Sequence, residues 1–202
     1  FYTGVNEYLY EGATPFTNDL FSMKYQIFRP YDTKRTEFKL KESIGNVTVY
    51  KNTDKTALAY AMDDMVKTWD YQDYNPFYVQ NDLATSAFDV DELFHMIETE
   101  KPKLNNCKIT SDNGDGEYVF ENTSAQPDNM VFTIKSSKAR QLYVHFDGSQ
   151  VENTVIEKNG EQILTGRLDS QIIYLGNVQK GDVIRIKMQL KQDDVMSGVV
   201  RL

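Results

Sequence analysis

The residues best suited to chemistry in this chain form an aromatic and amide cluster between positions 69 and 81. Its members are Trp69, Asp70, Tyr74, Asn75, Phe77, Gln80 and Asn81. Flat aromatic rings stack on the apolar faces of sugars, and carboxylate or amide side chains bond sugar hydroxyls. Ligand sites in general combine apolar walls with a few placed polar groups in this way. The cluster therefore predicts a glycan-binding surface.

A purely structural role for the same residues stays open. Asn75-Pro76 is typical of a helix start, with Asn as the N-cap and Pro at the first helical position. The rings of Trp69, Tyr74 and Phe77 can equally pack the interior of a small domain. If a glycan binds, one stacked ring and a few hydroxyl bonds predict a dissociation constant on the order of millimolar.

Other chemical motifs in the chain are weak. His95 and His145 are far apart, and the neighbours Asp63 and Asp64 would point to opposite faces of a strand. The acidic run 112–117 concentrates oxygen atoms but lacks the spacing of an EF-hand. No Gly-rich phosphate loop or zinc-binding motif occurs. We therefore expect no catalytic residue, no metal site and no cofactor, and a hydrolase acting through Asp63 or Asp64 is the weakest interpretation.

The composition limits the partners. The 202 residues carry a formal net charge of −8, so nucleic acid is not an expected partner. The same charge repels anionic lipid surfaces unless a local basic patch overrides it. Cys107 is the only cysteine and excludes an internal disulfide. The longest apolar run, 57–62, is far shorter than the roughly 20 residues that span a bilayer, so we expect a soluble piece whose membrane tie lies outside it.

The cluster is expected within a small mixed α/β portion covering residues 1–104. Helices are predicted for Asn6–Tyr10, after an N-cap at Asp19, from Asn75-Pro76 onward, and after an N-cap at Asp89. Strands are predicted for Met23–Phe28, Thr36–Lys41, Val47–Tyr50 and Leu58–Met62. A hairpin joins the second and third of these strands.

After Asn106 the apolar period changes to two, which indicates strands. Eight are predicted: 107–110, 117–121, 130–135, 141–146, 154–158, 161–165, 171–175 and 183–190. Polar turns separate them, and Asn159-Gly160 supplies both positive φ angles of a type I′ hairpin. Residues 105–202 are therefore predicted to be an antiparallel, jelly-roll-like β-sandwich, and the whole chain belongs to the α+β class.

Several short motifs occur in an order that is itself informative. They are Asn6–Tyr10, Leu20–Ile27, Val47–Tyr50 followed by Asn52, Asn75–Asn81, and Ile172–Gly176 followed by Lys180-Gly181-Asp182. In order and spacing they resemble the bacterial YfhO-type membrane proteins, and the similarity covers most of the chain.

The resemblance implies a function that composition and periodicity do not. YfhO-type proteins are polytopic membrane proteins related to GT-C glycosyltransferases, which use lipid-linked sugars. In Gram-positive bacteria they are implicated in glycosylating lipoteichoic acid outside the cell. The resemblance therefore implies that this chain is an extracellular domain at the cell membrane. Its implied partner is the transmembrane portion of the same polypeptide, and its implied ligand is a glycan or lipid-linked sugar. The family's catalytic acids lie on loops between membrane helices, so none is carried over here.

Two classes of function stay open. The first is a non-catalytic extracellular domain of a membrane glycosyltransferase. The second is a free-standing secreted carbohydrate-binding module. The full open reading frame would separate them, because only the first predicts many hydrophobic spans before Phe1.

Overall fold

A computed structural model describes most of the chain. The described residues are 2–4, 7–8, 12–30, 32, 36–54, 57, 59–69, 75–97, 99–112, 117–123, 129–146, 151–168, 171–190 and 197–201. Their contacts divide the chain into unit 1, of Phe1–Asp32 and Thr36–Met96, and unit 2, of Thr33–Arg35 and Ile97–Leu202. The predicted domains 1–104 and 105–202 stay a prediction.

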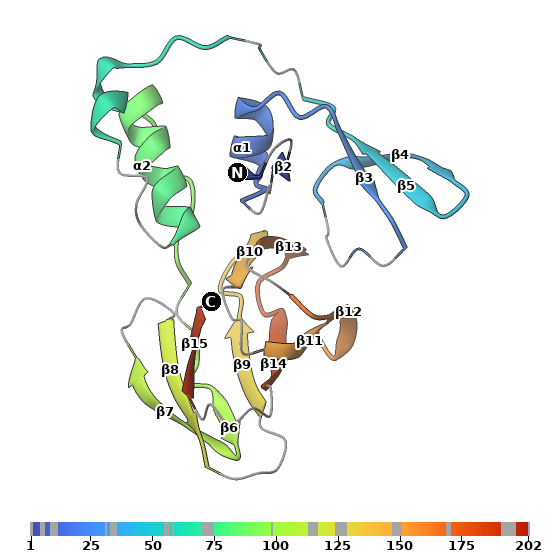
Figure 1. Ribbon diagram of the computed structural model, residues 1–202, viewed down its shortest axis with the longest axis vertical. Coiled ribbons are helices and arrows are strands. Elements are labelled where there is room, and N and C mark those ends of the chain that lie inside the picture. The colour runs from blue at the N-terminus through green and yellow to red at the C-terminus, as the bar shows by residue number, and fades with distance from the viewer. Residues whose placement is uncertain are drawn as a thin grey trace. The chain divides into compact units, whose positions relative to one another are not determined.

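Unit 1 combines short helices with small antiparallel sheets (Figure 1). Its elements are β1 (Tyr2–Gly4), β2 (Glu7–Tyr8), α1 (Pro15–Leu20), β3 (Tyr25–Phe28), β4 (Lys39–Ile44), β5 (Val47–Lys51), the 3-10 helix η1 (Asp64–Thr68) and α2 (Pro76–Phe88). β1 pairs with β2, and β3, β5 and β4 form a three-stranded sheet in that order. The predicted hairpin of β4 and β5 is confirmed, with the turn at Gly45-Asn46.

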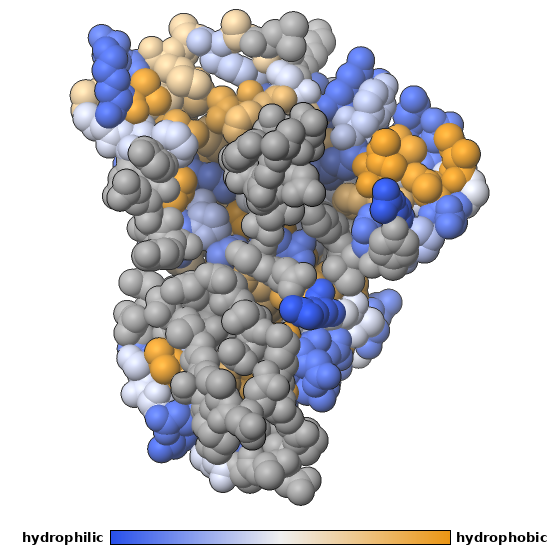
Figure 2. All heavy atoms as spheres, in the orientation of Figure 1, coloured by the Kyte–Doolittle hydropathy of each residue, from blue (hydrophilic) through white to orange (hydrophobic). Residues whose placement is uncertain are grey.

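The three-stranded sheet of unit 1 is unusually exposed. All six residues of β4 are exposed, and β3 alternates between exposed and half-buried residues. On the visible face, hydrophobic residues gather over this sheet and hydrophilic residues border them (Figure 2). A sheet face of this kind is uncommon in a soluble domain, where one face is normally buried.

Side-chain caps set the ends of both α-helices. The Asn75 side chain accepts the Phe77 N–H and so begins α2 as predicted. α1 begins at Thr14, which forms a reciprocal capping box with Thr17. The predicted N-cap at Asp19 is therefore wrong, because Asp19 lies within α1.

Asp89 ends a helix instead of beginning one. Its backbone is left-handed, with φ 52° and ψ 40°, and its N–H donates to the Thr85 carbonyl at 3.0 Å. The described residues after it form no helix, so the predicted second helix is wrong. An Asp tolerates this left-handed conformation better than most residues, so the same residue type can cap either helix end.

Two further predictions for unit 1, a helix and a strand, are wrong because each was based on a short apolar run. The predicted helix Asn6–Tyr10 is wrong at its described residues, because Glu7 and Tyr8 pair with Gly4 and Tyr2 in a small antiparallel sheet. Leu58–Met62 is not a buried strand: none of its described residues is in a strand, and Met62 is 42% exposed. A short apolar run carries too little periodicity to fix its structure.

Unit 2 is built from antiparallel strands (Figure 1). These are β6 (Lys103–Asn105), β7 (Cys107–Asp112), β8 (Glu117–Asn122), β9 (Asn129–Lys135), β10 (Arg140–Phe146), β11 (Val151–Lys158), β12 (Glu161–Gly166), β13 (Gln171–Val178), β14 (Val183–Leu190) and β15 (Ser197–Arg201). The sheets have the orders β12-β11-β14-β9-β6, β15-β8-β7 and β10-β13. All eight predicted strands are confirmed, and β6 and β15 were not predicted.

Alternating apolar residues of these strands form one core in unit 2. On β14, Ile184, Ile186, Met188 and Leu190 are buried and the residues between them are exposed. The cluster joins residues of the five-stranded sheet to residues of β8, β10 and β13. A β-rich antiparallel chain with two short α-helices is thus confirmed for the described residues, and the jelly-roll sandwich stays a prediction.

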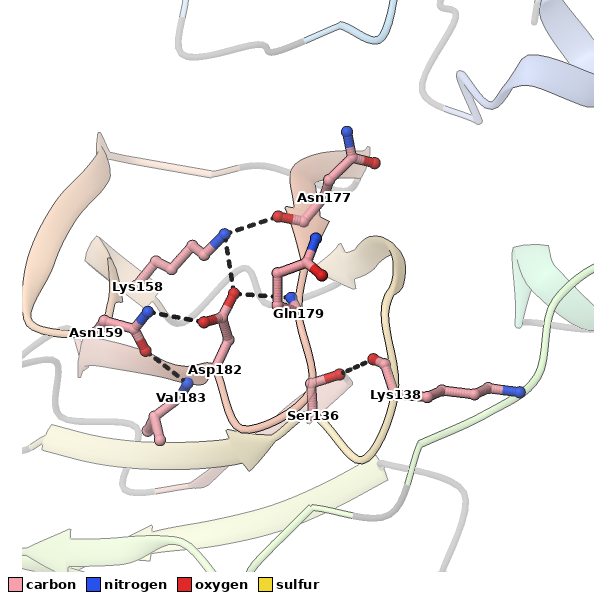
Figure 3. A network of polar contacts seen from close by, with 8 residues as sticks. All are labelled: Ser136, Lys138, Lys158, Asn159, Asn177, Gln179, Asp182 and Val183. Atoms are coloured by element: carbon pink, nitrogen blue, oxygen red, sulfur yellow. Dashed lines mark hydrogen bonds and ion pairs between the residues drawn. The ribbon is translucent and has the colours of Figure 1, made fainter.

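Polar contacts fix the turns at one end of the five-stranded sheet (Figure 3). The Asn159-Gly160 turn has φ angles of 53° and 87°, as a type I′ hairpin requires. Asp182 accepts hydrogen bonds from the Gln179 N–H at 2.8 Å and the Asn159 amide at 2.9 Å, and pairs with Lys158 at 3.0 Å. These bonds, chiefly that of the backbone N–H, lower the pKa of Asp182 from 3.8 to about 2.

Candidate functional site

Trp69, the centre of the predicted glycan surface, lies at the end of η1 and is half-buried. Its indole Nε1 donates to the Val79 carbonyl of α2 at 2.9 Å. This bond fixes the ring against α2, and the residue as a whole is partly exposed. Asp70 and Tyr74 lie outside the described residues.

Two of the predicted residues hold α2 inside unit 1. Phe77 is 6% exposed, and its ring packs against Phe94 with centroids 5.2 Å apart. Gln80 is 5% exposed, and its Oε1 accepts the hydroxyl hydrogen of buried Thr14. Both side chains therefore have structural partners that account for their position.

Asn81 joins α2 to the segment that follows it. Its Oδ1 accepts the N–H groups of Leu93 at 3.0 Å and Phe94 at 2.9 Å, and its Nδ2 donates to the Phe94 carbonyl at 2.8 Å. These three bonds hold Leu93 and Phe94 in a non-helical segment, where the sequence predicted a helix. Together with the capping role of Asn75, they explain the amide residues of the cluster without a ligand.

A second polar assembly, which the sequence did not single out, surrounds α1. Asn18 is fully buried, donates to Glu37 Oε1 at 2.8 Å and accepts from the Gln26 amide at 3.3 Å. The Asn52 amide, 7% exposed, donates to Asp19 Oδ1 at 2.8 Å. α1 is thus bonded through its side chains to β3, to the residue before Phe38 and to the residue after β5.

Three of these residues, Asp19, Glu37 and Asn52, line a small open hollow of about 60 Å³. Its walls are Pro15, Asp19, Glu37, Phe38, Lys39, Asn52, Thr53 and Asp54. Typical small-molecule sites have volumes of roughly 300–1,000 Å³, so this hollow can hold an edge of a ligand but cannot enclose one. It offers carboxylate acceptors, one lysine donor and an apolar wall, a set suited to hydroxyl groups.

Glu37 is the most perturbed group at this hollow. Burial raises the pKa of its carboxyl above the ordinary value, and the hydrogen bonds from its own backbone and from Asn18 oppose part of that effect. The charged form is therefore less favourable here than in water. A ligand hydroxyl that donates to Glu37 would relieve this penalty, because hydrogen bonding to a carboxylate stabilises its charged form.

Two signals in the sequence pointed toward this hollow without identifying it. Asn52 followed the strand Val47–Tyr50 as part of a motif, and Asp19 was noted as a helix cap. Neither residue type nor spacing indicated that Asp19 and Asn52 would meet. Glu37 and Lys39 carried no signal, because charged residues in a polar stretch are normally solvated.

The weaker candidates have local partners. Asp63 caps η1 by accepting the Met65 N–H at 2.8 Å, and exposed Asp64 pairs with Lys67. His95 lies beside Glu92 at the surface, and His145 is half-buried on β10. Of the run 112–117, residues 113–116 lie outside the described residues. No group of three or more His, Cys, Asp or Glu side chains within the described part of the chain is arranged to hold a metal ion.

Comparison with known families identifies the class of protein. The chain matches the family described as Bacterial membrane protein YfhO over residues 1–198. It therefore belongs to that family of bacterial membrane proteins, and the resemblance inferred from the motifs is confirmed. No curated protein matches the chain. Among the helices that the structure describes, none has the length and apolar character needed to cross a membrane.

Proposed function

We propose that this chain is the non-catalytic extracellular domain of a polytopic, GT-C-like membrane glycosyltransferase that acts in lipoteichoic acid glycosylation. The observation that carries the proposal is the family match, which spans nearly the whole chain and names a membrane protein. The partner is the transmembrane portion of the same polypeptide, and the parent enzyme draws on a lipid-linked sugar. Membership of a membrane-protein family favours this role over a free-standing secreted carbohydrate-binding module.

Within this role, unit 1 makes the glycan contacts. Trp69 is held by its bond to the Val79 carbonyl and is only half-buried as a residue, which supports its role as a stacking ring. The hollow beside α1 presents Asp19, Glu37 and Lys39 to ligand hydroxyls next to an apolar wall. Such contacts give weak binding, on the order of millimolar, which suits a domain that guides a substrate past a membrane-embedded site.

Unit 2 is the scaffold in this proposal. Its sheets pack as a jelly-roll-like β-sandwich across one apolar core. The boundary between the two predicted domains lies near residue 104 of the sequence. A scaffold needs a rigid interior, and the alternating apolar residues of β9 and β14 supply one.

Maleimide labelling of the full-length protein in intact cells tests the extracellular placement. In a full-length background whose cysteines outside these 202 residues are replaced by serine, Cys107→Ser with Thr165→Cys leaves one exposed thiol, on β12. An impermeant maleimide should label it in intact cells as fully as after lysis. Labelling only after lysis would place the domain inside the cell and end the proposal.

Ligand titration tests the glycan contacts separately. N-acetylglucosamine and glycerol-phosphate fragments are titrated while ligand-observed NMR measures binding. Trp69→Ala and Asp19→Asn should each weaken binding about tenfold, the loss of one stacking or charged contact. Phe21→Ala, at an aromatic residue 47% exposed in unit 1, is the matched control and should leave affinity unchanged. Sugar transfer or glycoside hydrolysis by the isolated chain would contradict the non-catalytic role.

A further inference from the structure

One face of the sheet β3-β5-β4 brings exposed apolar residues together. Tyr25 and Ile27 alternate on β3 and so point to the same face. Ile27 lies opposite Val49 on β5, and Val47 lies opposite Ile44 on β4, which places all five residues on that face. We call these five residues and the lysines around them the sheet patch.

The apolar members of the sheet patch are open to solvent. Ile27 is 63% exposed, Ile44 62% and Tyr25 40%, and Val47 and Val49 are half-buried between them. Single exposed apolar residues are ordinary, whereas a contiguous group on one face indicates an interaction surface.

Lysines border the apolar residues of the sheet patch. The ammonium groups of Lys24 and Lys41 lie 5.7 Å and 5.0 Å from the centre of the Tyr25 ring. Lys39 and Lys51 lie opposite each other at the end of the face that carries Tyr25. All four lysines are exposed, so their charges are available to a partner.

The charge of this region is opposite to that of the chain. Residues 24–28 and 39–51 carry four lysines and a single acid, Glu42, for a formal charge of +3. Since the whole chain carries −8, the remainder carries −11. Glu42 lies opposite Val49 and therefore on the same face, among the residues of the sheet patch. Its pair with Lys41, at 3.8 Å between two half-exposed side chains, is weak, and the region keeps its net positive charge.

We propose that the sheet patch docks on an anionic lipid surface. Its isoleucines enter the boundary between headgroups and acyl chains, and Tyr25 sits at headgroup depth, where aromatic rings with a polar end concentrate. The lysines reach lipid phosphates with their ammonium groups while their stems cover apolar surface. This docking goes beyond the proposed glycan role and does not depend on it.

Charge complementarity selects the lipid surface over other occupants. In a two-fold contact between two copies of the chain, the same patch faces itself, so the lysines of both copies would repel one another. A second copy could bind the lysines only through a separate acidic face. A lipid surface supplies both an apolar layer and a plane of negative charge at the depths where the sheet patch has isoleucines and lysines. The chain's membrane-protein family makes such a surface available.

Vesicle co-sedimentation of the 202-residue chain tests the proposal. The vesicles are phosphatidylglycerol mixed with phosphatidylcholine in equal parts, and pure phosphatidylcholine for comparison. The chain should sediment with the anionic vesicles only, and less so at high salt. A triple variant, Lys39→Gln, Lys41→Gln and Lys51→Gln, should lower the partition coefficient about a hundredfold, at about fivefold for each lysine near the surface.

Two further variants separate specific docking from general electrostatics. The control triple, Lys135→Gln, Lys138→Gln and Lys180→Gln, changes the net charge equally at exposed lysines of unit 2 and should bind as the parent does. Ile27→Ser with Ile44→Ser should lower partitioning about tenfold at unchanged charge, through lost apolar burial. Circular dichroism checks that every variant is folded.

Four results would overturn the proposal. They are no binding to anionic vesicles, equal binding to neutral vesicles, an equal loss in both lysine triples, and no effect of the isoleucine changes. If the chain self-associates in solution and Ile27→Ser abolishes this without affecting vesicle binding, the sheet patch joins two copies of the chain instead.

Discussion

The two units differ most in what they bury. Among the described residues, unit 1 buries five apolar side chains and five polar ones, whereas unit 2 buries 21 apolar side chains and three polar ones. The buried polar residues of unit 1 surround α1, and most of them have hydrogen-bond partners on other elements. Unit 2 instead has the continuous apolar core of a strand-built domain.

This difference separates two ways of holding a small domain together. The stability of an apolar core depends little on the exact orientation of its side chains, because the burial of apolar surface is non-directional. A polar interior depends on every bond being made, since a single missing partner leaves a buried group unsatisfied. Unit 1 therefore has a fixed arrangement of polar groups beside a hollow, and unit 2 has a continuous apolar core.

The largest effect is expected from Phe132→Ala in the core of unit 2. Phe132 is fully buried and packs against Tyr118 with ring centroids 5.1 Å apart. Its removal should lower the free energy of unfolding by about 3–5 kcal/mol through lost burial and a residual cavity. Urea unfolding followed by circular dichroism measures this loss. Phe21→Ala, at an exposed ring, is the control, and a similar loss in both variants would refute the core assignment.

A smaller loss is expected from Asn18→Ala at the centre of unit 1. The change removes the amide that donates to Glu37 and accepts from Gln26, and should cost about 1–3 kcal/mol. Trp69 is the only tryptophan, so its fluorescence reports the unfolding of unit 1. Gln162→Ala, at an exposed amide of unit 2, should change stability by less than about 0.5 kcal/mol. If Asn18→Ala is equally harmless, unit 1 does not depend on its polar interior.

Thr154→Val should stabilise the protein, unlike the two preceding variants. The Thr154 hydroxyl is buried in unit 2 and has no hydrogen-bond partner among the described residues, and valine has nearly the same shape. Removing this unsatisfied group should raise the free energy of unfolding by about 1 kcal/mol. A rise in the urea midpoint at an unchanged slope is the expected result, and a fall would mean that the hydroxyl contributes to stability.

The pH dependence of stability should differ in direction between the units. The pKa of Asp182 is about 2 in the folded state against an ordinary 3.8, so the unfolded state binds more protons in that window. The stability Asp182 contributes is present above pH 3.8 and is lost as pH falls toward 2. The pKa of Glu37 is raised above 4.5, so the folded state binds more protons and stability falls as pH rises through the folded pKa.

Two amide variants isolate these contributions. Asp182→Asn should flatten the acid side of the stability curve, and Glu37→Gln should flatten the fall that begins above pH 4.5. Unfolding is followed by circular dichroism for the first variant and by Trp69 fluorescence for the second. An unchanged pH profile in Glu37→Gln would mean that its carboxyl is solvated and that the hollow exerts no electrostatic constraint.

The sequence predicted the structure of unit 2 better than that of unit 1. In unit 2 the period of two located all eight predicted strands, and it is clearest in β9, β10 and β14, which bury one face in the apolar core. β6 was missed since Lys103–Asn105 is short and exposed on all three residues. In unit 1, the predictions located the strands β3, β4 and β5 and the start of α2 at Asn75-Pro76, but missed the start of α1, whose cap is Thr14.

The candidate site was predictable only in part. The predicted glycan surface at residues 69–81 stays a prediction, and two of its members, Phe77 and Gln80, are interior residues with partners of their own. The hollow was missed because it depends on contacts between residues far apart in the chain, such as Asp19 with Asn52. Polar pairs of this kind have no periodic signal, whereas apolar alternation does.

The most direct test of the division between a recognising unit and a scaffold is an amide NMR titration of the 202-residue chain. N-acetylglucosamine or glycerol-phosphate fragments are added up to saturation, and chemical-shift changes are mapped on both units. The account predicts changes confined to unit 1, around Trp69 and around the hollow formed by Asp19, Glu37 and Asn52. Shifts centred on the strands of unit 2, or none in unit 1 at saturating ligand, would contradict it.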